Sequence, residues 1–185
     1  MNIVITGFEP FGGSTVNASW EAVRRMTGAE KRLLPVSFAR AGAEIRRIVA
    51  AGPDAVICVG EAAGRTAVSV ERVAVNLMDA RIPDNDGAQP VDAPVSPSGP
   101  AAYFATLPTR QIVDRLRDAG IPAELSCTAG TYVCNATFYK LMDMIAQSGK
   151  PILGGFIHVP AGGMDAETIA QALQIAVGCV EAGLS

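Results

Sequence analysis

One cysteine and the single histidine of this 185-residue chain are the side chains best placed to perform nucleophilic chemistry. Cys134 follows an expected strand at 121–126 and opens a segment with apolar residues at helical spacing, so it should lie near a helix N-terminus. The backbone N–H groups and the positive end of the helix dipole there favour an anion, so we expect this thiol to ionise more easily than a free thiol. The same N–H groups could stabilise the oxyanion that forms when a thiolate attacks a carbonyl group.

His158 could supply the general acid that such an attack requires, because imidazole is the usual proton donor near neutral pH. It follows an apolar run, 152–157, with the pattern of a buried strand, and sites in open α/β sheets lie at the carboxyl ends of strands. Alternatively, His158 is a structural histidine and Cys134 a small apolar filler, a common role for a buried free cysteine. The presence of both at strand ends beside glycines favours the catalytic interpretation.

A carboxylate could orient the histidine. Glu71 stands between two expected strands, 66–70 and 72–77, with apolar neighbours on either side. A buried carboxylate needs a partner because an unpaired buried charge is costly, so Glu71 could hold the imidazole in the productive tautomer. Asp84, in the charged loop 79–87, is the competing candidate.

Two arginines accompany these acids, Arg65 before Glu71 and Arg81 before Asp84. Either arginine could pair with an acid, stabilise an oxyanion or order the 79–87 loop. The sequence leaves these three roles open.

The loop 7–13 places Phe8 and Phe11 among glycines and a proline, which is unusual for a loop in solvent. The two rings either fold back onto the core or line a pocket for a flat, mostly apolar group. The glycines do not match the G-x-G-x-x-G spacing of dinucleotide sites. Asn17 is expected to cap the helix that follows.

Expected strands and helices alternate along the chain, which predicts an α/β fold with helices on both sides of the sheet. Further strands are expected at 2–6, 32–36 and 55–59, and further helices around 18–26, 38–52, 108–120 and 165–180. The Pro- and Ser-rich segment 91–100 should be irregular. A chain of this length can form one domain with a substantial core, so we expect a single domain over 1–185.

The composition of the chain argues against several classes of binding partner. A net charge of -3 with 49% hydrophobic residues lacks the basic excess of a nucleic-acid binder. No apolar run approaches the roughly 20 residues that span a bilayer, and the first residues lack a signal-peptide pattern, so we expect a cytoplasmic protein. One histidine and four dispersed cysteines predict reduced thiols and neither a metal site nor a cofactor.

Several longer motifs follow one another along the chain: GFEPFGG at 7–13, ERVAVN at 71–76, DARIPDN at 79–85, AGTYVCN at 129–135 and GFIHVP at 155–160. Together they resemble the pyroglutamyl-peptidase I family, also called pyrrolidone-carboxylate peptidases. The resemblance extends to about residue 160, and the order of several long motifs makes it far more specific than any one of them.

The resemblance implies a cysteine peptidase that removes an N-terminal pyroglutamyl residue from peptides through a thioester. Cys134 matches the nucleophile of the family, His158 the acid/base and Glu71 the orienting acid. The resemblance also implies a three-layer α/β/α fold with a twisted mixed, largely parallel sheet, as in purine nucleoside phosphorylases. The family often assembles as a homotetramer, so a homo-oligomer is expected.

By the same resemblance, a lactam ring would lie between Phe8 and Phe11. The residues expected nearby are Asn17, Ile82, Tyr132 and Val133. Tyr132 stands where the family usually has phenylalanine, which adds a hydroxyl near the pocket. Two other functions are left open: a non-catalytic binder of blocked peptide N-termini, and a nucleoside-phosphorylase-like enzyme, for which more evident phosphate-binding arginines would be expected.

Overall fold

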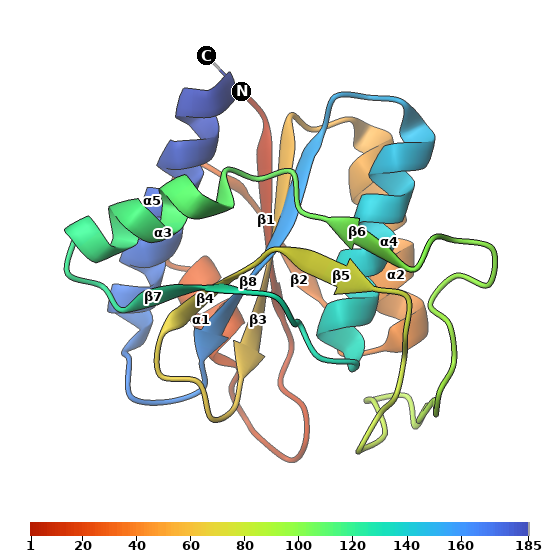
Figure 1. Ribbon diagram of the computed structural model, residues 1–185. Coiled ribbons are helices and arrows are strands. Elements are labelled where there is room, and N and C mark those ends of the chain that lie inside the picture. The colour runs from red at the N-terminus through yellow and green to blue at the C-terminus, as the bar shows by residue number, and fades with distance from the viewer. Residues whose placement is uncertain (185) are drawn as a thin grey trace.

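Runs rich in β-branched and other apolar residues form most strands of the central sheet. The computed structural model describes residues 1–184. Six strands belong to this sheet: β1 (Ile3–Phe8), β2 (Glu30–Leu34), β3 (Ala55–Ala62), β4 (Val68–Glu71), β7 (Ala123–Ser126) and β8 (Leu153–Pro160). They lie in the order β2-β1-β3-β8-β4-β7 and form the middle layer of the molecule (Figure 1).

The strands differ in direction. β1, β2, β3 and β8 run parallel to one another, so their carboxyl ends meet at one edge of the sheet. β4 is antiparallel to β8 and parallel to β7, which confirms the mixed, largely parallel sheet. The antiparallel pairing sets Ser69 opposite His158 and Glu71 opposite Phe156. It thereby brings Glu71 and His158 onto neighbouring strands.

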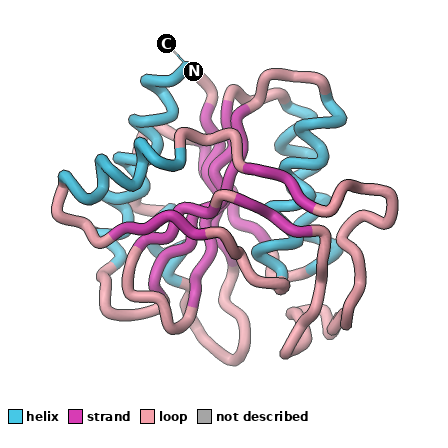
Figure 2. The backbone as a smooth tube through the Cα atoms, viewed as in Figure 1, coloured by secondary structure: helices cyan, strands magenta, loops and turns pink. Residues whose placement is uncertain are grey.

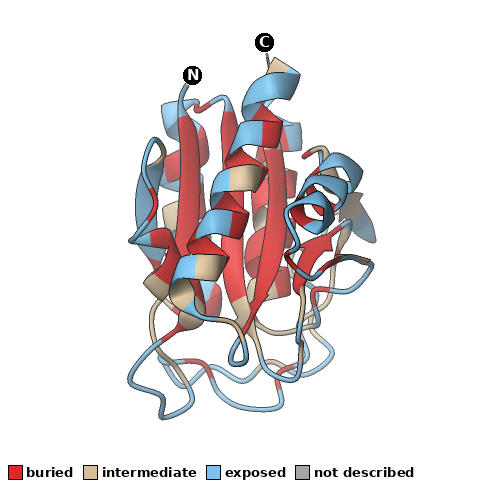
Figure 3. Ribbon diagram, turned by 90° about the vertical axis from the view of Figure 1, so that its left-hand side faces the viewer, coloured by how far each residue is buried: buried red, intermediate tan, exposed pale blue. Residues whose placement is uncertain are grey.

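Helices cover both faces of the sheet and bury their apolar sides against it. One face carries α1 (Ala18–Val23), α3 (Thr109–Asp118) and α5 (Ala166–Leu184), and the other carries α2 (Phe38–Ala51) and α4 (Val133–Ser148) (Figure 1). Each helical layer forms its own hydrophobic core with the sheet, so the central strands are buried (Figure 3). The three-layer α/β/α fold expected from the sequence is confirmed.

Side-chain caps fix two helix starts near the expected positions. Asn17 accepts a backbone N–H at the start of α1, and Asp165 does so at the start of α5. The structure ends α1 at Val23, so Met26 lies beyond the helix in which it was expected, although it is buried.

A second sheet of two antiparallel strands, β5 (Val73–Val75) and β6 (Ala102–Phe104), lies beside α4 (Figure 2). β5 falls within the expected strand at 72–77, whereas β6 was not expected from the sequence. Across the described residues, no helix is both long enough and apolar enough to cross a membrane.

Candidate active site

The nucleophile candidate lies at the start of α4. Cys134 is the second residue of this helix, after the N-cap residue Tyr132, so the free backbone N–H groups of the first turn surround it. Gly130 supplies a left-handed turn, with φ of 75°, in the segment between β7 and α4. The buried side chain of Asn135 donates to the carbonyl of Val75 at 2.9 Å and accepts its N–H at 3.0 Å. This pair of bonds fixes the first turn of α4 against β5.

His158 and Glu71 form a buried hydrogen-bonded pair. The imidazole Nδ1 lies 2.8 Å from Oε1 of the carboxylate, and the two residues are 4% and 0% exposed. The ring of Phe156 packs on the imidazole with the centroids 4.8 Å apart. Because Nδ1 is engaged by the carboxylate, Nε2 is the ring nitrogen left for proton exchange.

Gly60 lies next to the sulfur. It is the register partner of His158 on the neighbouring strand, β3. A methyl group on Gly60 would lie 2.8 Å from Sγ of Cys134 and 2.7 Å from Cζ of Phe156, closer than a side-chain carbon can approach. The absence of a side chain at this position therefore leaves room for the thiol over β3, the strand next to the one that carries His158.

Gly60→Ala should lower kcat/KM roughly 10- to 100-fold, because the added methyl group displaces the sulfur from its position over β3. Steady-state hydrolysis and thermal unfolding, measured together, check this expectation. Gly178→Ala is the matched control, since a methyl group at that position in α5 meets no atom within 4 Å. Equal activity of the two variants would contradict the assigned position of the sulfur.

The thiol and the imidazole are both neutral in the resting protein at neutral pH. Burial raises the pKa of Cys134 to about 12, and the charge of Glu71 adds to this effect. Burial also lowers the pKa of His158, against the opposing influence of its bond to Glu71. The expectation that Cys134 ionises more easily than a free thiol is therefore wrong, because desolvation of the sulfur favours the neutral thiol.

A small pocket opens in front of Cys134. Its lining residues are Phe8, Phe11, Asn17, Val36, Glu61, Tyr132, Val133 and Cys134. Both interpretations of the two phenylalanines hold, because Phe8 is buried against the core ring of Phe156 and still faces the pocket. Phe11 is partly exposed at the same pocket.

Tyr132 braces one wall of the pocket. Its ring lies against Phe11, with centroids 6.0 Å apart, and meets Phe38 edge-on at 5.5 Å. Its hydroxyl donates to the carbonyl of Pro83 at 3.0 Å. The additional hydroxyl thus ties the wall to the 79–87 loop.

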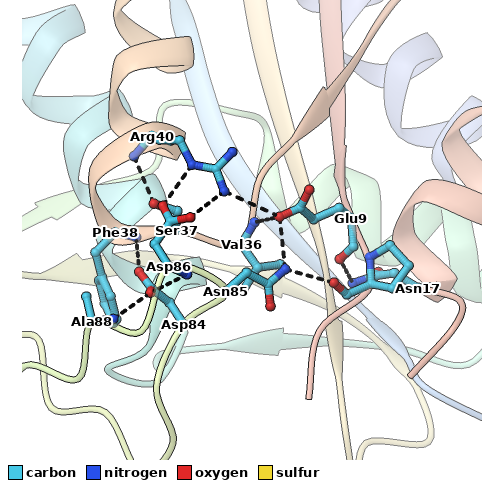
Figure 4. A network of polar contacts seen from close by, with 11 residues as sticks. Glu9, Asn17, Val36, Ser37, Phe38, Arg40, Asp84, Asn85, Asp86 and Ala88 are labelled. Carbon is cyan, nitrogen blue, oxygen red and sulfur yellow. Dashed lines mark hydrogen bonds and ion pairs between the residues drawn. The ribbon is translucent and has the colours of Figure 1, made fainter. Parts of the chain in front are cut away.

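A network of polar contacts holds the loop of Phe11 against the 79–87 loop (Figure 4). The amide of Asn85 donates to Oε1 of Glu9 and to the carbonyl of Pro10, both at 2.9 Å. Glu9 and Pro10 belong to the same loop as Phe11, so these bonds fix the backbone that carries the ring.

Three other residues that the sequence suggested for the site are not in contact with the His158–Glu71 pair. Asp84 is buried, but its carboxylate accepts three backbone N–H groups from its own loop and the start of α2, and is not bonded to His158. Arg81 is exposed, and its side chain has no hydrogen-bond or ion-pair partner within residues 1–184. Ile82 is 44% exposed and does not line the pocket. The structure therefore pairs His158 with Glu71.

Two pocket residues were not foreseen. Val36 follows β2 and Glu61 lies near the end of β3, so both come from strand ends on either side of β1. Oε2 of Glu61 accepts the N–H of Ala18 at 2.6 Å and so supports the start of α1. The sequence did carry one signal, because both residues follow apolar runs at the sheet edge where sites are built.

The chain resembles known proteins both in sequence and in fold. A family model described as pyroglutamyl peptidase matches residues 1–180. The chain is 53% identical over 170 residues to the pyrrolidone-carboxylate peptidase of Gloeobacter violaceus, covering 86% of this chain and 82% of that protein. Pyroglutamyl peptidase I from Bacillus amyloliquefaciens has a TM-score of 0.93 at 44% identity, covering 97% of this chain and 94% of that one. A variant of Pyrococcus furiosus pyrrolidone carboxyl peptidase has a TM-score of 0.95 at 37% identity, with full coverage of both chains. The chain therefore belongs to the pyroglutamyl peptidase family.

Proposed function

We propose that this protein is a cysteine peptidase that hydrolyses the bond after an N-terminal pyroglutamyl residue. The observation that carries the proposal is a thiol that faces a mostly apolar pocket from a helix N-terminus and lies over Gly60, the register partner of a histidine in a buried imidazole–carboxylate pair. Family membership supports the same activity and argues against the nucleoside-phosphorylase alternative.

The first chemical step joins the sulfur to the substrate. As Sγ of Cys134 attacks the pyroglutamyl carbonyl carbon, Nε2 of His158 takes the thiol proton, and Glu71 stabilises the imidazolium that forms. The negative charge moves to the carbonyl oxygen, where backbone N–H groups at the start of α4 stabilise it. Arg81 has no other partner among the described residues and is exposed, so it can support the same oxyanion.

The second step breaks the peptide bond. The imidazolium of His158 gives its proton to the departing nitrogen, the C–N bond breaks and a thioester to Cys134 is left. A water molecule then gives a proton to the same imidazole and attacks the thioester carbon. The C–S bond breaks, the sulfur regains its proton and free pyroglutamate leaves. Neither step requires a metal or a cofactor.

Specificity follows from the charge of the substrate end. A lactam is neutral, so a pocket lined by Phe8, Phe11 and Val133 can accept it. The amide of Asn17 donates one hydrogen to the carbonyl of Glu9, which leaves the second for the lactam oxygen. An ordinary N-terminus would bring an ammonium group into this pocket, at a cost of at least a few kcal/mol if it is unpaired.

Glu61 also lines the pocket, but one of its carboxylate oxygens is already engaged by the N–H of Ala18. We therefore assign Glu61 to the pocket wall and expect no preference for charged N-termini.

A pair of fluorogenic amides, one pyroglutamyl and one glutaminyl, tests the function under reducing conditions. We expect the pyroglutamyl amide to be hydrolysed roughly 100-fold faster or more, because the glutaminyl ammonium is poorly solvated in the pocket. Equal cleavage of the two would contradict the assigned specificity. A folded protein that binds the pyroglutamyl amide without cleaving it would instead be the non-catalytic binder.

The proposal includes three features of the whole protein: one catalytic domain over 1–185, a location in the cytoplasm, and assembly as a homotetramer. The composition and the motif resemblance support the first two, and the resemblance alone supports the third. Native mass spectrometry of the purified protein tests the assembly, and a monomer at micromolar concentration would overturn that part.

A further inference from the structure

Arg65 makes a contact with the buried acid of the site that the mechanism above does not use. It follows Gly64, whose φ of 80° turns the chain after β3. Its Nη1 donates to Oε1 of Glu71 at 2.7 Å, and its side chain is 22% exposed. A partly exposed cation therefore contacts the carboxylate that orients the histidine.

The two oxygens of Glu71 are used unequally. Oε1 accepts from both Arg65 and His158, whereas Oε2 is buried without a hydrogen-bond partner among residues 1–184. A fully buried carboxylate favours its protonated form unless a cation or several donors stabilise the charge. Arg65 is the cation in direct contact with this carboxylate.

The same guanidinium reaches the segment that leads into the nucleophile helix. Nη2 of Arg65 donates to the carbonyl of Thr128 at 2.8 Å, six residues before Cys134. One planar side chain thus joins β4, which carries Glu71, to the loop between β7 and α4. A lysine at this position could supply the positive charge, but it could not make both guanidinium hydrogen bonds, to Glu71 and to Thr128.

We propose that Arg65 is a positioning residue for the peptidase reaction: it holds Oε1 of Glu71 in place against Nδ1 of His158, and it supplies a fixed positive charge beside that pair. This inference rests on the proposed function. It adds a fourth member, acting through Glu71, to the set formed by Cys134, His158 and Glu71.

The other ionisable groups around the imidazole are two acids and one thiol. Cys134 lies on α4 and Glu61 on β3, and Glu124 on β7 is bonded to Ser69, the register partner of His158 on β4. Arg65 therefore opposes the acids that surround the histidine. In agreement, its charge acts to lower the pKa of His158 and that of Cys134.

The sign of the pH effect follows from this arrangement. Without the cation, a proton binds more favourably to His158, so the imidazole is protonated at a higher pH. The pH at which activity is lost on acidification should rise accordingly, because the protonated pair can no longer accept the thiol proton.

Three variants test the inference: Arg65→Gln, Arg65→Lys and the control Arg72→Gln. Arg72 is exposed and follows Glu71 directly, so the control makes the same substitution one residue from the carboxylate. Two readouts are measured for each variant: the pH profile of kcat/KM with a pyroglutamyl amide, and the NMR titration of the imidazole. The chain contains one histidine, so a tag-free protein gives a single imidazole signal.

For Arg65→Gln we expect both midpoints to move up by about one pH unit and kcat/KM to fall at its optimum. Arg65→Lys should keep both midpoints near those of the wild type while kcat/KM falls roughly 10- to 100-fold, because the bond to Thr128 is lost. Thermal unfolding of each variant identifies any loss of folded protein.

Midpoints of Arg65→Gln that match those of Arg72→Gln would overturn the inference, whatever the rates. Wild-type protein without hydrolytic activity would overturn the proposed function instead, and the imidazole titration would still decide the role of Arg65.

Discussion

Cys134→Ala should abolish hydrolysis of a pyroglutamyl amide, with a loss in kcat of about 100,000-fold or more. The side chain removed is the one that forms the covalent bond to the substrate, and no other cysteine lies in the pocket lining. His158 and Glu71 keep their bond but have no thiol proton to accept. A stopped assay at high enzyme concentration measures any residual rate.

The control for this loss is Cys179→Ala, which removes a buried thiol from α5 on the opposite face of the sheet from α4. We expect it to retain wild-type kcat and to lose some thermal stability. Calorimetric binding of a pyroglutamyl peptide to Cys134→Ala tests substrate binding by the pocket independently of the nucleophile. Retained binding without hydrolysis is the expected outcome, and hydrolysis at the rate of Cys179→Ala would show that the nucleophile lies elsewhere.

Glu71→Gln should lower kcat roughly 1,000- to 10,000-fold, because the neutral amide no longer stabilises the imidazolium formed when His158 takes the thiol proton. The substitution keeps the shape of the side chain but leaves the guanidinium of Arg65 without its buried counter-charge. The negative charge of Glu71 acts to raise the pKa of His158, so its removal should shift the imidazole titration to a lower pH. This shift is opposite in sign to that expected for Arg65→Gln.

Glu124→Gln provides the comparison for Glu71→Gln. Glu124 is bonded to Ser69 on β4, so it lies on the next strand and makes no contact with the imidazole ring nitrogens. We expect its kcat to stay within a few-fold of the wild type. Similar losses in the two variants would indicate a general effect of acid removal near β4 and not an orienting role for Glu71.

The sequence was sufficient to predict the layers and to place Cys134 and His158 at the ends of elements, because each depends on local signals. Apolar runs bounded by turn residues gave the central strands, and the spacing after Cys134 gave the start of α4. The direction of β4 is not a local property, so its antiparallel pairing with β8 could not be read from residues 68–71. The choice between Glu71 and Asp84 depends on that pairing, and only the structure brings Glu71 next to the histidine.

Two features of the site depend on surroundings that a linear pattern does not contain. The position of Cys134 at a helix start indicated an acidic thiol, but burial of the sulfur in the folded protein raises its pKa. Similarly, Ile82 belongs to a motif of the family, yet it is 44% exposed and is not among the residues that line the pocket.

The place of β8 in the sheet has a consequence for biosynthesis. β8 is the last strand in the chain, but it lies between β3 and β4, so the two halves of the sheet are separate until residues 153–160 have been synthesised. The same strand carries His158. A ribosome-bound chain that stops before this strand thus has neither a closed sheet nor an acid/base for its thiol. Hydrolytic competence therefore arises only after β8 has joined the sheet.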